Sequence, residues 1–160
     1  MRKIVCFHHP CEPNGYLSNW YASSFELDNV IFSSVEQYMM FCKAKTFCDS
    51  EIGQQIMATD NVGKIKALGR SVKNYDEVIW NGLRQIIVYE GLVAKFKQNT
   101  DLSKLLLETE DAVLAECSVQ DKVWGIGLSM KDERCFDIHQ WLGANLLGFT
   151  LMQVRNTLAK

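Results

Sequence analysis

A carboxylate and an amine stand two helical turns apart in a stretch that is otherwise largely apolar. Glu36 and Lys43 lie within residues 33–47, whose side chains predict a helix. At about 100° per residue both side chains fall on one face of that helix, roughly 10 Å apart along its axis. That separation suits a bound sugar better than a salt bridge, so we expect the functional site here.

Two simpler interpretations compete with this one. Ser33 followed by Glu36 fits a capping box, in which the carboxylate only binds the amide at the helix start. Lys43 fits a surface lysine whose stem covers apolar surface while its ammonium stays in water. However, the predicted helix has no clear polar side, and a helix that is apolar nearly all round is usually buried. Charged side chains on such a helix need a reason.

The composition is that of one globular domain. With 160 residues the chain is long enough to bury a single core without disulfides or metals. Hydrophobic residues make up 48% and charged residues 22%, and the formal net charge of −2 shows no basic excess. Electrostatic binding to duplex nucleic acid is therefore not expected, and any nucleic-acid role would have to be local.

The cysteines and histidines show no metal-binding spacing. The six cysteines form no C-x-x-C pair and no Cys/His cluster of the zinc type, so we expect reduced thiols, no metal and no cofactor. His8 and His9 lie near Cys11, but they adjoin a proline turn and fit loop residues. The first residues hold too few apolar side chains for a signal peptide, and no run is long enough for a membrane span. We therefore expect a cytoplasmic protein that does not contact membranes.

Local patterns predict a few short strands and helices over most of the chain. Asp28-Asn29 predicts the turn of a hairpin within residues 25–32, directly before the central helix. Gly69 predicts the end of a short helix and leaves Arg70 just outside it, while Asp76 predicts the cap of a long helix. The predicted order is strand 3–7, loop 8–15, hairpin 25–32, helices 33–47, 51–58, 62–68, 77–97 and 102–108, strand 112–117, irregular segment 118–143 and helix 145–158.

The irregular segment 118–143 holds candidates for substrate binding. Trp124 stands beside Gly125 and Gly127. A loop of this composition is rarely only a connector, because Trp is costly to expose and Gly permits close backbone approach. Trp124 is therefore a candidate for stacking on a planar group of a ligand, and both glycines permit a ligand to approach the backbone. Trp80 is a second stacking candidate, but its place in the apolar stripe of a long helix favours a core role.

Three polar residues are candidates for binding a sugar or a phosphate. Asn19 stands among aromatic residues and fits either a turn or a contact with ribose hydroxyls. Arg70 fits either a phosphate ligand or a cation that caps a helix C-terminus. Asn145 precedes the last helix, where capping is the default interpretation.

Several short stretches, in a fixed order, make the chain similar to one family. They are Leu17–Trp20, Ser34–Met40 with Lys43 and Ala44, Gly69 and Arg70, Trp80, Ala94–Phe96, Leu106 and Leu107 with Thr109, Glu116, Asp121 with Trp124–Gly127, and Gly143–Gly148 followed by Leu151, Met152 and Arg155. Any one of them is weak evidence. Together, over nearly the whole chain, they resemble the NADAR family of YbiA-like N-glycosidases.

The resemblance implies the α+β class, as a single compact, mostly helical domain with a few short strands over residues 1–160. It also implies an enzyme that cleaves N-glycosidic bonds of ribosides. Family members act on phosphoribosylamino-pyrimidine intermediates of riboflavin synthesis or remove ADP-ribose from modified nucleobases. The family's acid and helix lysine match Glu36 and Lys43, and the resemblance gives the lysine a Schiff-base role toward ribose C1. The family often has His after the glutamate, so Gln37 puts a proton-transfer role at that position in question.

The residue types agree with that chemistry. Breaking a C1–N bond builds positive charge on the sugar, so the site needs a carboxylate or a nucleophile at C1 and a proton for the departing base. Glu36 and Asp121 can supply the carboxylates. Lys43 can act as the nucleophile if burial among apolar neighbours destabilises its ammonium.

A non-catalytic module that binds ADP-ribose or NAD is the alternative. Such a module needs the aromatic residues and Arg70 but has no use for a desolvated amine, so the combination of Glu36, Lys43 and Asp121 favours the enzyme. The expected partner is a small-molecule riboside or an ADP-ribosyl substrate. Nucleic acid is expected only as a modified substrate.

Overall fold

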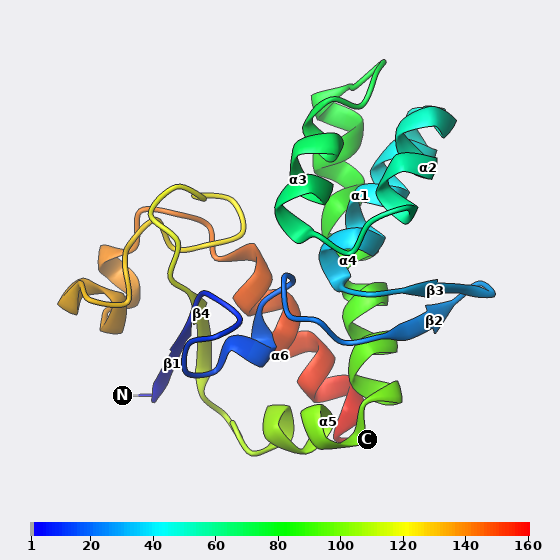
Figure 1. Ribbon diagram of the computed structural model, residues 1–160. Helices are drawn as coiled ribbons and strands as arrows, with labels where there is room; N and C mark the ends of the chain where they lie inside the picture. The colour runs from blue at the N-terminus through cyan, green and yellow to red at the C-terminus, as the bar shows by residue number, and fades with distance from the viewer. Residues whose placement is uncertain (1) are drawn as a thin grey trace. The chain divides into compact units, whose positions relative to one another are not determined.

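The computed structural model describes residues 2–160, which gather into two compact units. One unit is Ala22–Gln98, and the other joins the residues before Ala22 to Asn99–Lys160. Each unit combines helices with one sheet of two short strands (Figure 1). The predicted α+β class with mostly helical content is confirmed, while the prediction that the whole chain is one domain stays a prediction. Among the described residues, no helix has both the length and the hydropathy needed to cross a bilayer.

Helix α1 (Val35–Thr46) is the centre of the unit Ala22–Gln98. It packs against α2 (Ser50–Met57), α3 (Val62–Arg70) and α4 (Glu77–Gln98) (Figure 1). Packing on several sides explains why this helix lacks a polar face. Its buried apolar residues are Val35, Tyr38, Met39, Met40 and Ala44. The predicted buried central helix is therefore confirmed.

The hairpin that precedes α1 consists of β2 (Phe25–Leu27) and β3 (Val30–Phe32), paired antiparallel with Phe25 opposite Phe32. Asp28 and Asn29 both have positive φ, 54° and 63°, as the two central residues of a type I′ turn require. Phe25 and Phe32 are buried and lie edge-on to the ring of Tyr38, at 6.1 and 5.1 Å between ring centroids. The turn and these aromatic contacts attach the predicted hairpin to the central helix.

The start of α1 differs from the predicted capping box. Ser34, not Ser33, is the N-cap, and its Oγ accepts a hydrogen bond from the Gln37 amide at 3.1 Å. The reciprocal bond comes from Gln37, whose Oε1 accepts from the Ser33 amide at 2.8 Å. The capping-box interpretation of Ser33 with Glu36 was therefore wrong, and the carboxylate of Glu36 does not make the cap.

Gly69 does not end α3, which continues to Arg70. A Cβ at Gly69 would overlap the side chain of Met40, so the glycine is explained by the close approach of α3 to α1. The N-cap of α3 is Asn61, whose side chain accepts from the Lys64 amide. Because α3 ends at Arg70, this residue lies in the last turn of the helix and not outside it.

The second unit is built on a parallel pair of strands. Strand β1 (Ile4–Phe7) pairs with β4 (Val113–Glu116), Ile4 lying opposite Val113 and Phe7 opposite Glu116. Helix α6 (Leu146–Leu158) packs on β4, and α5 (Thr100–Leu107) packs on α6. A Cβ at Gly148 would overlap the Leu114 carbonyl, so this glycine allows α6 to lie directly on the strand.

Three 3-10 turns complete this unit: η1 (Gly15–Leu17), η2 (Glu133–Phe136) and η3 (Ile138–Gln140). The turns η2 and η3 lie within the predicted irregular segment 118–143. This segment contains no α-helix and no β-strand. The predicted strands and helices of this unit are confirmed to within a few residues at their ends.

Candidate active site

Lys43 is held in place by three contacts on one side of α1. Its Nζ donates a hydrogen bond to the Gly69 carbonyl oxygen at 2.8 Å. The same nitrogen lies 4.4 Å from the centroid of the Tyr75 ring and 5.8 Å from that of Trp80. Lys43 is half-buried, so the interpretation as an ordinary surface lysine does not describe its surroundings.

The surroundings of Lys43 destabilise its ammonium form. Burial lowers the pKa of the amine below its ordinary value, and the positive charge of Arg70 lowers this pKa further. The faces of Tyr75 and Trp80 attract a cation and act in the opposite direction, but this attraction is modest at a partly exposed site. A neutral amine can still donate to the Gly69 carbonyl, which leaves its lone pair available for bond formation.

Glu36 lies in the first turn of α1 and is only 4% exposed. A helix N-terminus favours a negative charge, and Glu36 stands at this end of α1. Because the cap is made by Ser34 and Gln37, the carboxylate is not needed there. Glu36 and Lys43 are separated by two helical turns, about 10 Å along the axis.

Gln37, at the position where the resembled family often has His, has a structural role. Its Nε2 donates to the carbonyl oxygens of Ile56 and Thr59, at 3.2 and 3.0 Å. Its Oε1 accepts from both the amide and the hydroxyl of Ser33. The side chain is therefore saturated with hydrogen bonds that connect the start of α1 to the end of α2, and it has no proton to transfer.

Trp80 and Arg70 both lie close to Lys43. Trp80 is 6% exposed on α4, which agrees with the core interpretation, although its ring also faces the amine. Arg70 is exposed and directly follows Gly69, whose carbonyl binds Lys43.

Tyr75 is a site residue that the sequence did not predict. It lies in the connection before α4, and the residues around it show no periodic pattern. The signal available was an aromatic residue directly before the helix cap Asp76, whose Oδ1 accepts from the Ile79 amide.

In the second unit, Asn19 has the strongest indication of a binding role. Its side chain is 6% exposed, yet its Oδ1 has no hydrogen-bond partner among the described residues. Buried polar atoms in folded proteins are nearly always paired, so this oxygen can accept a hydrogen bond from a water molecule or a bound ligand. A ribose hydroxyl can donate such a bond.

Asp121 shapes the loop that presents Trp124. Its Oδ1 accepts from the amides of Val123 and Trp124, at 3.0 and 2.8 Å, which is an Asx-type turn. One carboxylate oxygen is therefore used by the backbone. Trp124 itself is half-buried, so part of its ring is available for stacking.

Packing and backbone conformation within the protein explain why Gly125, Gly127 and Asn145 occupy their positions. A Cβ at Gly125 would lie 2.8 Å from the Glu116 carbonyl oxygen, and Gly127 has a φ of 73°. Asn145 is fully buried with a φ of 51° and makes no side-chain cap, contrary to the default expectation. Its Oδ1 instead accepts from the Glu116 amide at 3.0 Å, and its Nδ2 donates to the Leu114 carbonyl at 2.8 Å. Contacts of these three residues with substrate stay predictions.

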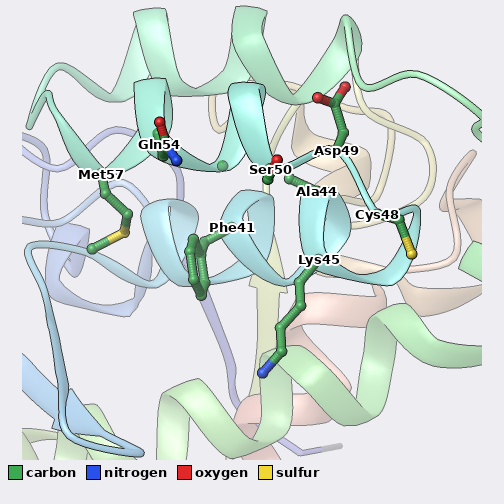
Figure 2. Close-up of a pocket in the computed structure, with 9 residues that line it drawn as sticks. Phe41, Ala44, Lys45, Cys48, Asp49, Ser50, Gln54 and Met57 are labelled. Atoms are coloured by element: carbon green, nitrogen blue, oxygen red, sulfur yellow. The ribbon is translucent and has the colours of Figure 1, made fainter.

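A cavity of about 570 Å³ lies along α1 and α2, away from Lys43. Figure 2 shows the residues that line it, with Phe41 and Lys45 on α1 and Gln54 and Met57 on α2. Its surface is largely apolar, and Lys43 and Glu36 are not among the lining residues. The carboxylate that lines it, Asp49, already accepts hydrogen bonds from the Ile52 and Lys73 amides, and we place the candidate active site at Lys43.

Among the described residues, three cysteines lie close enough together to hold a metal ion. They are far apart in the sequence, so their spacing did not predict a metal site. Cys6, Cys117 and Cys135 are buried, and their Sγ atoms all lie within 4.8 Å of one another. The thiols are free, as expected, but they form a cluster that sequence spacing did not predict. The residues around Lys43 include no such group.

Comparisons with known proteins agree with the resemblance. The family model described as "NADAR domain" matches residues 6–159. The chain is 42% identical over 143 residues to "N-glycosidase R617" of Acanthamoeba polyphaga mimivirus, covering 86% of this chain and 84% of that protein. It is 30% identical to "Riboflavin biosynthesis protein VVA0006" of Vibrio vulnificus, covering 99% of this chain and 39% of the larger protein. The solution structure of Escherichia coli YbiA superimposes with a TM-score of 0.80 at 28% identity, over 99% of this chain and 87% of that one.

Proposed function

This chain belongs to the NADAR domain family and is an N-glycosidase, and we propose that it cleaves the C1–N bond of a riboside with Lys43 and Glu36 as its catalytic residues. The observation that carries this mechanism is the half-buried amine of Lys43, fixed by the Gly69 carbonyl and flanked by Tyr75 and Trp80. Burial lowers the pKa of this amine, which increases the fraction of the neutral form that a nucleophile requires.

In the proposed reaction the lone pair of Lys43 Nζ forms a bond to ribose C1. The C1–N bond to the base breaks, and the base leaves with the electron pair and takes a proton. Loss of a proton from Nζ and opening of the sugar ring then give an imine at C1 and a free hydroxyl at C4. Water adds to the imine carbon, which releases the amine and the free sugar. Glu36 stabilises the positive charge that develops on the sugar and exchanges protons with the departing base.

The substrate class we propose is a ribosylated base that carries phosphate. The relative named as a riboflavin biosynthesis protein favours a phosphoribosylamino-pyrimidine, and an ADP-ribosylated nucleobase is the second candidate. Asn19 with its unpaired oxygen suits a ribose hydroxyl, and exposed Arg70 suits a phosphate. Trp124 suits the base, and Asp121 orients the loop that carries it. A cytoplasmic location stays a prediction.

An activity screen tests this proposal. Purified protein is incubated with each class of riboside, and mass spectrometry measures the released base and sugar. Release of free base from one class, with first-order dependence on enzyme, is the expected result. Binding of ADP-ribose or NAD without release of base from any riboside would instead assign the chain to the non-catalytic class.

Replacement of Trp124 by alanine should weaken substrate binding by about 1–3 kcal/mol, the usual worth of a base–aromatic stack. The ring is half-buried in a loop that Asp121 already holds through backbone amides, so we expect the fold to persist. KM and thermal unfolding of the variant provide the measurement. Trp124→Phe is the matched control, because it keeps an aromatic face and should retain most of the affinity. A variant that unfolds would show that this ring belongs to the core.

The glycosidase reaction should not need a divalent metal. The groups that surround Lys43 are two aromatic rings, a guanidinium and the Gly69 carbonyl oxygen, which already accepts a hydrogen bond from Nζ; a divalent ion is usually held by several carboxylate or imidazole ligands, and these groups include neither. Treatment with EDTA should leave turnover unchanged, as measured by base release before and after chelation. Loss of turnover that a divalent ion restores would contradict the proposed mechanism.

A further inference from the structure

Three buried cysteines meet in the second unit, although they are far apart in the sequence. Cys6 lies in β1, Cys117 directly follows β4, and Cys135 lies in η2. Their Sγ atoms all lie within 4.8 Å of one another, and the three residues are 8%, 2% and 0% exposed. We refer to Cys6, Cys117 and Cys135 as the thiol cluster.

The backbone fixes the thiol cluster independently of any ion. The Cys117 amide donates to the Phe7 carbonyl at 2.8 Å, which extends the pairing of the two strands. The Cys135 amide donates to the Asp132 carbonyl at 2.9 Å. The Cys135 carbonyl accepts from the Trp141 indole nitrogen at 3.0 Å. The three sulfurs are therefore positioned before a ligand arrives, which reduces the entropy cost of binding.

We propose that the thiol cluster binds one Cu(I) ion through its three sulfurs. Soft thiolate and thioether ligands select Cu(I), zinc and iron–sulfur clusters. A three-coordinate ion with metal–sulfur bonds of about 2.3 Å needs sulfurs about 4 Å apart, a spacing that lies inside the 4.8 Å limit of the cluster. Each thiol that binds as a thiolate releases its proton to solvent.

The number of ligands favours copper over zinc. Structural zinc sites are almost always four-coordinate, with Cys or His at each position. The group found among the described residues has three members and no fourth His, Cys, Asp or Glu. Cu(I) accepts three sulfur ligands. The buried side chains that pack with the cluster are apolar: Ala115, Ile126 and Leu128.

Copper bound here would tie together three segments of this unit. β1 and β4 are already paired, whereas Cys135 belongs to the irregular segment that also carries Trp124 and Asp121. An ion that binds only the folded form stabilises it by mass action. The proposal concerns a site separate from Lys43 and does not depend on the glycosidase reaction.

The experiment uses the full chain with Cys11→Ser, Cys42→Ala and Cys48→Ser, which removes every thiol outside the cluster. This background protein is reduced under anaerobic conditions and titrated with Cu(I) supplied as its bathocuproine disulfonate complex. We expect the protein to withdraw one Cu(I) per chain, and X-ray absorption to report three sulfur neighbours. The midpoint of thermal unfolding should rise with bound copper. A parallel titration with Zn(II) should give no tight stoichiometric binding.

Cys135→Ala in the same background is the matched variant, and it should lose stoichiometric binding. If that variant does not fold, the sulfur coordination number of copper in the background protein decides the question without it. Copper that stays with the competitor, copper bound by nitrogen or oxygen, or equal binding after Cys135→Ala would each overturn the proposal. Tight binding of Zn(II) in place of Cu(I) would also overturn the assignment to copper.

Discussion

Replacing Lys43 with arginine should lower turnover by on the order of 10³-fold or more and remove any adduct trapped by borohydride. Borohydride reduces an imine to a stable secondary amine, so the wild-type protein should gain the mass of the reduced sugar on Lys43. Arginine keeps a positive charge and much of the stem, but its guanidinium stays protonated and cannot form the imine. Base release and intact-protein mass spectrometry measure the two effects.

Two other lysines of the same unit make this test selective. Lys45 lies on α1 but is exposed, so Lys45→Arg is the matched control and should keep both turnover and adduct. Lys95 is fully buried on α4, and burial lowers its pKa to about 7, which makes it the rival nucleophile. Peptide mapping distinguishes the two candidates. An adduct on Lys95, or full activity in Lys43→Arg, would contradict the assignment of Lys43.

The rate should also depend on pH in a direction fixed by Lys43. The neutral amine is the reactive form, so kcat should rise with pH and level off above the lowered pKa of Lys43. Arg70→Gln removes a positive charge that lowers this pKa, so the rising limb should move to higher pH. Profiles of kcat against pH, recorded at saturating substrate, measure the shift of the rising limb. Loss of phosphate binding would instead change KM. An unchanged limb in Arg70→Gln would mean that another group controls the rate.

Local signals in the sequence were sufficient where the structure is decided by neighbouring residues. Asp28 and Asn29 tolerate positive φ, which is what the observed type I′ turn needs. The apolar periodicity of α4 and the cap at Asp76 similarly predicted the long helix. The absence of a polar face on residues 33–47 predicted that this helix is central and buried.

The failures come from contacts between segments that are distant in the sequence. Gly69 signals a helix end by itself, but here it admits Met40 from another helix. Asn145 signals a cap, yet its amide group is used by the backbone of β4. Tyr75 comes close to Lys43 only because α3 and α4 fold back along α1. Sequence spacing relates only residues that are near one another in the chain, so it could not predict these long-range contacts.

Replacing Glu36 with glutamine should lower kcat by about 10²–10⁴-fold while leaving the fold intact. The cap of α1 is made by Ser34 and Gln37, so the substitution does not touch it. Glutamine has nearly the shape of glutamate and can replace its accepted hydrogen bonds, but it carries no charge and does not take up a proton. kcat, KM and the thermal unfolding midpoint measure these effects separately.

Glu77→Gln is the matched control for this carboxylate, because Glu77 also lies in the first turn of a helix but is exposed. A general loss of helix-dipole stabilisation would affect both variants to a similar small extent, whereas a chemical role affects Glu36→Gln alone. If Glu36→Gln keeps its activity, the carboxylate serves only the packing of α1. If it keeps the borohydride adduct but releases product slowly, Glu36 acts after the imine forms, in the hydrolysis of that intermediate. Loss of both adduct and turnover places Glu36 at the first step, where charge develops on the sugar.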